Sequence, residues 1–246
     1  MLFALAIGEI AVQMATLVQA VQAQRPAGRG PWEGFWDARC ALMHLLLVLA
    51  LVACSWVGWS HSKATGNQED TKDVFGIGFL VLLLDLWLVI AYFVIAKSVD
   101  RIVSPAGAPI SFVNERETEA LWVLVTFIGY AIWDALTKLR RDSSELQFKF
   151  RKLITTILKR YMKRGWVSLI CMAFAFAVYE SLPDKIPSRG ESPNAVLLTD
   201  GALLSLVFLF RALKQASDAR SRRRGVFWAV ITFVGGVICY CFSLVS

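Results

Sequence analysis

Four ionisable side chains lie inside long apolar runs of this 246-residue chain. They are Glu9, His44, Asp85 and Asp134. An ionisable group in hydrocarbon costs several kcal/mol unless it is paired, neutralised or hydrated, so it indicates either a route for protons or ions or a hydrogen bond between helices. Asp85 is the strongest candidate, because the six residues before it and the five after it are all apolar.

Two of these runs also carry a polar face, because residues three or four apart lie on the same side of a helix. The first face consists of Glu9, Gln13, Thr16 and Ala20, and the second of Thr126, Tyr130, Asp134 and Thr137. Each face needs shelter from lipid, which a water-filled path, the bundle interior or a neighbouring subunit would supply. For Asp134, a local ion pair with Lys138 four residues later is the plainer interpretation.

Other kinds of site receive little support from the sequence. His44 lies near one end of its run, where a histidine more often packs than senses pH. Phosphate-binding-loop, nucleophile-elbow and zinc-protease motifs are absent, and the five cysteines fit no metal or disulfide framework. We therefore expect no metal and no cofactor, and an enzyme is the least favoured class.

The elements that must position these residues are seven apolar runs separated by polar segments. Hydrophobic residues make up 57% of the chain, against about 45–50% in a soluble domain. Each run has close to the length that a helix needs to cross the bilayer, where the backbone must satisfy its own hydrogen bonds. The runs predict an all-α, polytopic transmembrane bundle in a single domain, residues 1–246. The predicted spans are 2–23, 40–60, 75–97, 119–137, 166–183, 195–213 and 226–245. The polar first run leaves open an interfacial helix and six crossings.

A further helix is predicted between the fourth and fifth spans, at about 144–164. Ser144 and Gln147 fit a capping box, and apolar residues then recur at helical spacing. The other faces carry Lys149, Lys152, Lys159 and Lys163. Such an amphipathic helix lies against anionic lipid headgroups or packs on the cytoplasmic ends of the spans, and the sequence does not separate the two.

The net charge of +7 is explained by the loops. Residues 138–164 and 211–224 contain 16 of the 26 Lys and Arg, including Arg222, Arg223 and Arg224. Cations of this kind mark cytoplasmic loops, so nucleic acid is not an expected partner. With seven crossings the N-terminus is cytoplasmic and the C-terminus external. The short loops are compatible with a bacterial inner membrane.

Three functions remain open at this level. The first is a conduit, meaning a channel, transporter or oligomeric pore, in which Glu9, Asp85 and the Thr126–Asp134 face line a common interior for protons or small ions. The second is a non-catalytic anchor, sensor or effector subunit whose basic segments contact a partner membrane subunit or a second copy. The third is a membrane-embedded enzyme. We favour the conduit.

Overall fold

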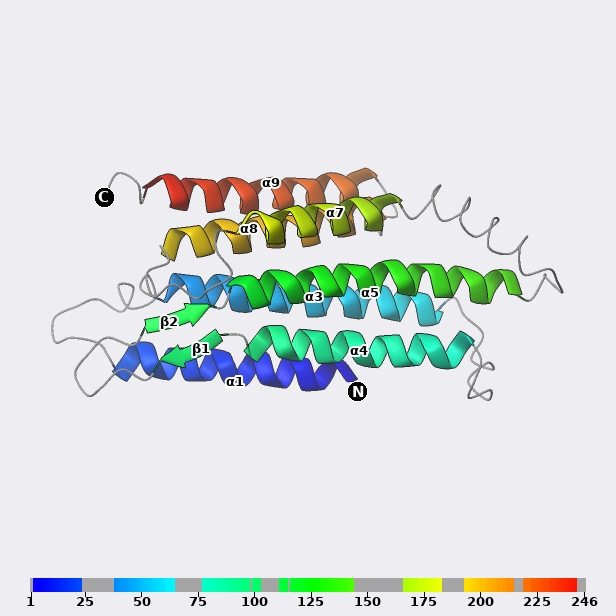
Figure 1. Ribbon diagram of the computed structural model, residues 1–246, viewed down its shortest axis with the longest axis horizontal. Helices are drawn as coiled ribbons and strands as arrows, with labels where there is room; N and C mark the ends of the chain where they lie inside the picture. The colour runs from blue at the N-terminus through cyan, green and yellow to red at the C-terminus, as the bar shows by residue number, and fades with distance from the viewer. Residues whose placement is uncertain are drawn as a thin grey trace.

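The computed structural model describes residues 2–23, 38–64, 77–97, 99–102, 111–114, 116–143, 166–182, 193–214 and 219–242. Seven helices lie in these ranges and run along the long axis of the molecule (Figure 1). They are α1 (Leu2–Ala23), α3 (Arg39–Ala64), α4 (Ile77–Lys97), α5 (Arg116–Ser143), α7 (Trp166–Glu180), α8 (Pro193–Lys214) and α9 (Ala219–Phe242). Each predicted apolar run falls on one of them, so the helical class is confirmed over the described residues.

Five helices contain a stretch that is long and apolar enough to cross a membrane. These stretches are Phe3–Gln22, Arg39–Ser60, Gly78–Lys97, Glu117–Thr137 and Ala195–Lys214. The apolar α7 has 15 residues and would extend about 22 Å, less than the roughly 30 Å of hydrocarbon. Helix α9 begins in a cationic segment, so its apolar part is shorter than the whole helix. Seven crossings therefore stay a prediction, while several apolar helices indicate an integral membrane protein.

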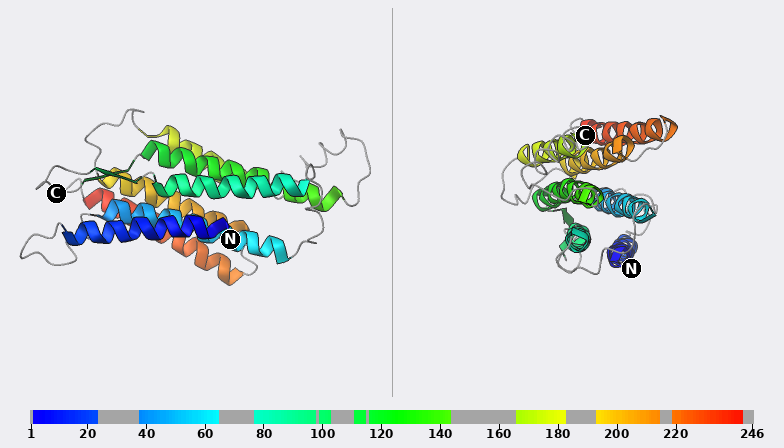
Figure 2. Two further views of the ribbon diagram at one scale, coloured as in Figure 1. Left: turned by 90° about the horizontal axis from the view of Figure 1, so that it is seen from below. Right: turned by 90° about the vertical axis from the view of Figure 1, so that its right-hand side faces the viewer.

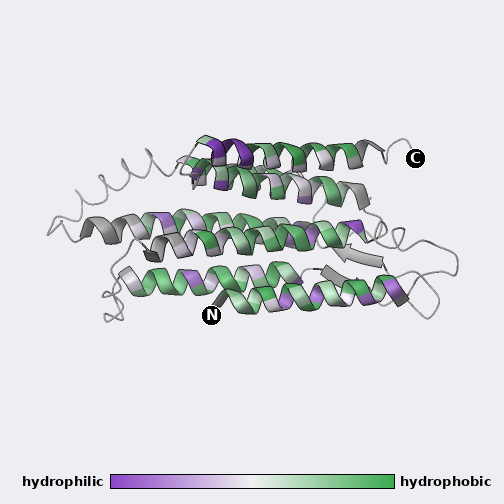
Figure 3. Ribbon diagram, turned by 180° about the vertical axis from the view of Figure 1, so that it is seen from behind, coloured by the Kyte–Doolittle hydropathy of each residue, from purple (hydrophilic) through white to green (hydrophobic). Residues whose placement is uncertain are grey.

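The helices form three layers. Helices α3 and α5 lie between α1 and α4 on one side and α7, α8 and α9 on the other (Figures 1 and 2). The core is apolar and includes Leu47, Leu51, Val123, Phe127 and Leu203. Large apolar side chains also cover the outside, as expected for a surface that faces lipid, whereas a hydrophilic stretch marks the start of α9 (Figure 3).

Helices α8 and α9 pack closely through small residues. A Cβ atom added at Gly201 of α8 would lie 3.2 Å from the Thr232 carbonyl oxygen and 3.3 Å from Gly236 Cα. Glycine at this position therefore lets the two backbones approach.

A two-stranded antiparallel hairpin connects α4 to α5 and was not predicted. Strand β1 (Val99–Ile102) pairs with β2 (Ser111–Asn114), with Val99 opposite Asn114. Each strand has only four residues, too few for a clear alternating pattern in the sequence. The predicted amphipathic helix and its lysines Lys149, Lys152, Lys159 and Lys163 lie outside the described residues.

Candidate functional site

Polar side chains occur at two levels along the inner faces of α3, α4 and α5. On α3, His44 and Ser55 are eleven residues apart, which places them on one face about 16 Å apart along the helix axis. On α5, Glu119 and Tyr130 have the same spacing. The two helices therefore bring a pair of polar residues together at each level.

The first level is a buried pair between His44 and Glu119, both 0% exposed. His44 Nδ1 lies 2.8 Å from Glu119 Oε1, and Nε2 lies 2.8 Å from the Ile95 carbonyl oxygen. The contact is defined by the 2.8 Å separation of the two atoms, since neither Nδ1 nor Oε1 has a hydrogen-bond partner of good geometry among the described residues.

The geometry indicates where this pair holds its protons. Both ring nitrogens of His44 face oxygen atoms, so Nε2 must donate to the Ile95 carbonyl and a proton must lie between Nδ1 and Oε1. That proton belongs either to an imidazolium beside a carboxylate or to a carboxylic acid beside a neutral imidazole. In both arrangements the pair has no net charge, which lowers the free-energy cost of burying it completely.

The second level is a cluster of three hydroxyl groups from three helices. The hydroxyl oxygens of Tyr92 and Tyr130 are 3.0 Å apart, and Ser55 Oγ hydrogen-bonds to both of them. The Tyr130 ring also stacks on the Phe210 ring, with centroids 5.3 Å apart and planes 9° apart. This stacking holds the cluster against α8.

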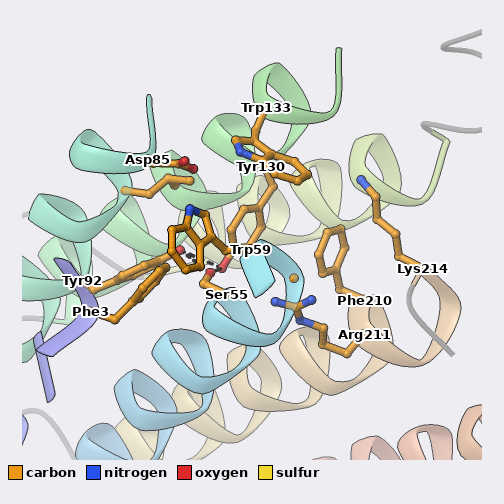
Figure 4. Close-up of a pocket in the computed structure, with 12 residues that line it drawn as sticks. Phe3, Ser55, Trp59, Asp85, Tyr92, Tyr130, Trp133, Phe210, Arg211 and Lys214 are labelled. Atoms are coloured by element: carbon orange, nitrogen blue, oxygen red, sulfur yellow. Dashed lines mark hydrogen bonds between the residues drawn. The ribbon is translucent and has the colours of Figure 1, made fainter. Parts of the chain in front are cut away.

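The hydroxyl cluster borders a partly open pocket with a cavity volume of about 50 Å³ (Figure 4). Asp85 and Arg211 lie on opposite sides of the cluster in this view, so the pocket has an acidic group on one side and a cation on the other. Most other lining side chains are aromatic. The lining residues include Phe3, Trp59, Leu88, Trp133, Phe210 and Lys214.

Arg211 is the most unusual residue of the pocket. Its Nε and Nη1 atoms are buried and have no hydrogen-bond partner among the described residues, and its guanidinium contacts the Cys54 thiol. Its position on the face of α8 that packs on α3 and α5 points the side chain into the pocket.

Lys214, one turn further along α8, is paired instead. Its Nζ lies 3.3 Å from Asp134 Oδ2 and donates to Ser168 Oγ at 2.8 Å. Asp134 therefore finds its cation on α8, whereas the sequence predicts a pair with Lys138, whose side chain lies outside the described residues.

The other predicted residues divide between the pocket and the rest of the bundle. Asp85 and Tyr130 line the pocket, and Asp134 contacts it through Lys214. Thr126 is buried and donates to its own helix, to the Trp122 carbonyl at 2.8 Å.

Glu9 is not among the residues that line the pocket. Its Oε1 accepts a hydrogen bond from Gln13 Nε2 at 2.8 Å, so the polar face of α1 is satisfied within that helix. On α8, Asp200 is 0% exposed and lies beside Cys40.

Several residues of these sites could not be singled out from the sequence. Glu119 follows Arg116 and Glu117 at the edge of a span, where a carboxylate usually reaches headgroup water. Ser55 and Tyr92 are common in membrane helices. The available signal is the eleven-residue spacing that places Glu119 and Tyr130 on the same face of α5.

No family model, curated protein or solved structure matches this chain. Among the described residues, no group of three His, Cys, Asp or Glu side chains could hold a metal ion. The pocket and the buried pair are therefore the features that indicate a function.

Proposed function

We propose that the protein is a membrane conduit for protons or small ions, with its route along the facing surfaces of α3, α4 and α5. The observation that carries this proposal is the placement of Asp85, the hydroxyl cluster and Arg211 around one pocket inside an apolar bundle. Polar groups in membrane helices are costly unless they are paired or hydrated, and those that border a pocket favour a route over packing alone.

The residues between the two levels support a conduit that is closed in this conformation. Val48, Leu51, Val123 and Phe127 lie between the His44–Glu119 pair and the pocket, and all four are 0% exposed. This apolar barrier excludes water and ions, so passage requires the helices to separate at this point. The buried pair would then form one end of the route and the pocket the other.

The test is flux through liposomes that contain the purified protein. Asp85→Asn should reduce proton or ion flux at least about tenfold, because the amide cannot release a proton or carry charge. Glu9→Gln is the matched control, since it neutralises a carboxyl on a membrane helix away from the pocket, and its flux should equal that of the wild type. Helical content and elution volume should be unchanged in both.

Two results would overturn the proposal. One is wild-type protein without flux of protons or of any tested monovalent ion. The other is equal flux in the wild type, Asp85→Asn and a Tyr92→Phe/Tyr130→Phe variant, because the pocket would then have no part in transport.

A second candidate is an interaction subunit that works through its basic segments, with the N-terminus in the cytoplasm of a bacterial cell. Arg222, Arg223 and Arg224 are exposed on the first turns of α9, where they are available to a partner or to anionic lipid. A photoreactive residue at position 223 should cross-link to one recurring chain in native membranes, and Arg222→Gln/Arg224→Gln should reduce the yield. Sustained flux by the protein purified alone would count against this candidate.

A further inference from the structure

We propose that the pocket binds a small organic oxyanion, a carboxylate or phosphate ester, through the guanidinium of Arg211. The proposal names the solute class of the conduit and to that extent rests on the proposed function. It concerns binding at equilibrium, however, and can be tested without measuring flux.

The first argument is the charge of Arg211. A guanidinium stays protonated in proteins, so it carries a full positive charge into the bundle. Its Nε and Nη1 atoms are buried without a hydrogen-bond partner among the described residues, and the Cys54 thiol that it contacts is a weak acceptor. The side chain is partly exposed, so its charge is partly desolvated, and an anion in the pocket would compensate that charge.

The neighbouring carboxylate of Asp134 already has a cation as its partner. Asp134 is held by Lys214 at 3.3 Å, and Lys214 is further fixed by Ser168. Asp85 lies across the pocket, with the hydroxyl cluster between it and the guanidinium (Figure 4). Among the described residues that line the pocket, no further carboxylate is placed beside Arg211, so the space there can take an acceptor that these residues do not supply.

A further argument is the chemistry of the walls. Phe3, Trp59, Trp133 and Phe210 line the pocket with aromatic rings. Mostly apolar walls with a few polar groups are typical of sites for small organic ligands, and the pocket is partly open, so a ligand need not fit within it entirely. A strongly hydrated inorganic ion would have to lose its water against these rings, whereas an anion with an apolar part would contact both the cation and the walls.

Binding can be measured by calorimetry on the full-length protein in an uncharged detergent, with benzoate and phenyl phosphate as probes. Both should bind saturably, and the neutral isostere benzamide should bind at least about tenfold more weakly, as expected when one charged partner is lost. Arg211→Gln should weaken benzoate binding by a similar factor. Arg220→Gln, which removes an exposed arginine at the start of α9, should leave it unchanged.

Two further variants keep the test decisive if Arg211→Gln does not fold. Arg211→Lys retains the charge and should retain weakened binding. Asp85→Asn removes a carboxyl that faces the same pocket and should retain or tighten binding, since like charge is removed; loss of benzoate binding in Asp85→Asn would overturn the inference.

The source of the anion is separated by lipid composition. In nanodiscs of neutral lipid, benzoate should bind as in detergent. Addition of an anionic phospholipid that competes with benzoate would identify a lipid headgroup as the natural occupant, and absence of competition would identify a free solute. Equal affinity for benzoate and benzamide, or equal weakening by Arg211→Gln and Arg220→Gln, would overturn the site.

The binding and flux measurements together also distinguish the oxyanion site from the conduit. Saturable binding in a protein that supports no flux would keep the oxyanion site and remove the conduit. Flux that survives Arg211→Gln, in a protein that does not distinguish benzoate from benzamide, would keep the conduit and remove the oxyanion site.

Discussion

Replacing Glu119 with leucine should lower the free energy of unfolding by about 3–5 kcal/mol, the range found when one partner of a buried ion pair is removed. The physical reason is that His44 remains between apolar side chains with only the Ile95 carbonyl as a partner. Replacing His44 with leucine should have a similar cost, because the Glu119 carboxyl would then be buried without a cation.

The variant that carries both substitutions, His44→Leu and Glu119→Leu, gives the coupling energy between the two side chains. Two leucines of comparable size fill the space with apolar atoms, and the only remaining cost is the lost donor to the Ile95 carbonyl, about 1–3 kcal/mol. This carbonyl lies in the last turn of α4, where helical carbonyl groups generally lack an intrahelical partner. The double variant should therefore be more stable than either single variant, with a coupling energy of several kcal/mol.

Unfolding can be followed by circular dichroism in mixed micelles as the denaturing detergent fraction rises. Glu119→Gln is the matched control, because the amide can donate to Nδ1 of a neutral imidazole and should cost only about 1 kcal/mol. Two results would refute the claim that the two side chains share a proton in a dry environment. One is a loss of less than about 1 kcal/mol in the free energy of unfolding of each single variant. The other is a loss in the double variant that equals the sum of the two single losses.

Three smaller tests address the packing and the pocket. Gly201→Val should lower the thermal unfolding temperature, because the valine side chain would meet the backbone of α9. Gly235→Val is the control and should not lower it, because the space around a Cβ atom at this position is open. Differential scanning fluorimetry compares the two variants. Asp134→Asn should cost about 1–2 kcal/mol in the same unfolding titration, since the Lys214 ammonium loses its counter-charge in a partly buried position. Tyr92→Phe should cost about 1–2 kcal/mol by the same measurement, because it removes one hydroxyl from a buried cluster.

The helices could be predicted from the sequence because their signal is local. An apolar run of membrane-spanning length must be helical whatever it packs against, so the predicted span 75–97 differs from α4 (Ile77–Lys97) only at its first residues. The ends are less certain where a helix continues into charged residues. Helix α9 begins at Ala219 rather than in the apolar run from 226, because arginine is a good helix former.

The partners of the polar residues could not be predicted because they depend on how the helices pack. Helical spacing places Asp85 and Tyr130 on definite faces of α4 and α5, but it does not say that these faces meet around Arg211. The same holds for His44, whose counter-charge comes from a helix more than seventy residues later. The sequence contains no signal that α3 packs against α5. A histidine with a buried carboxylate partner therefore cannot be told from one without such a partner.

The hairpin between α4 and α5 restricts how a route along these helices could open. Only residue 98 separates Lys97 from β1, and only residue 115 separates β2 from Arg116, so the paired strands tie the two helix ends together. Relative movement of α4 and α5 is therefore smallest beside the strands and largest at the far end. The helices would separate first at the end away from the strands. This movement would widen the space around Asp85 before the space around Glu119.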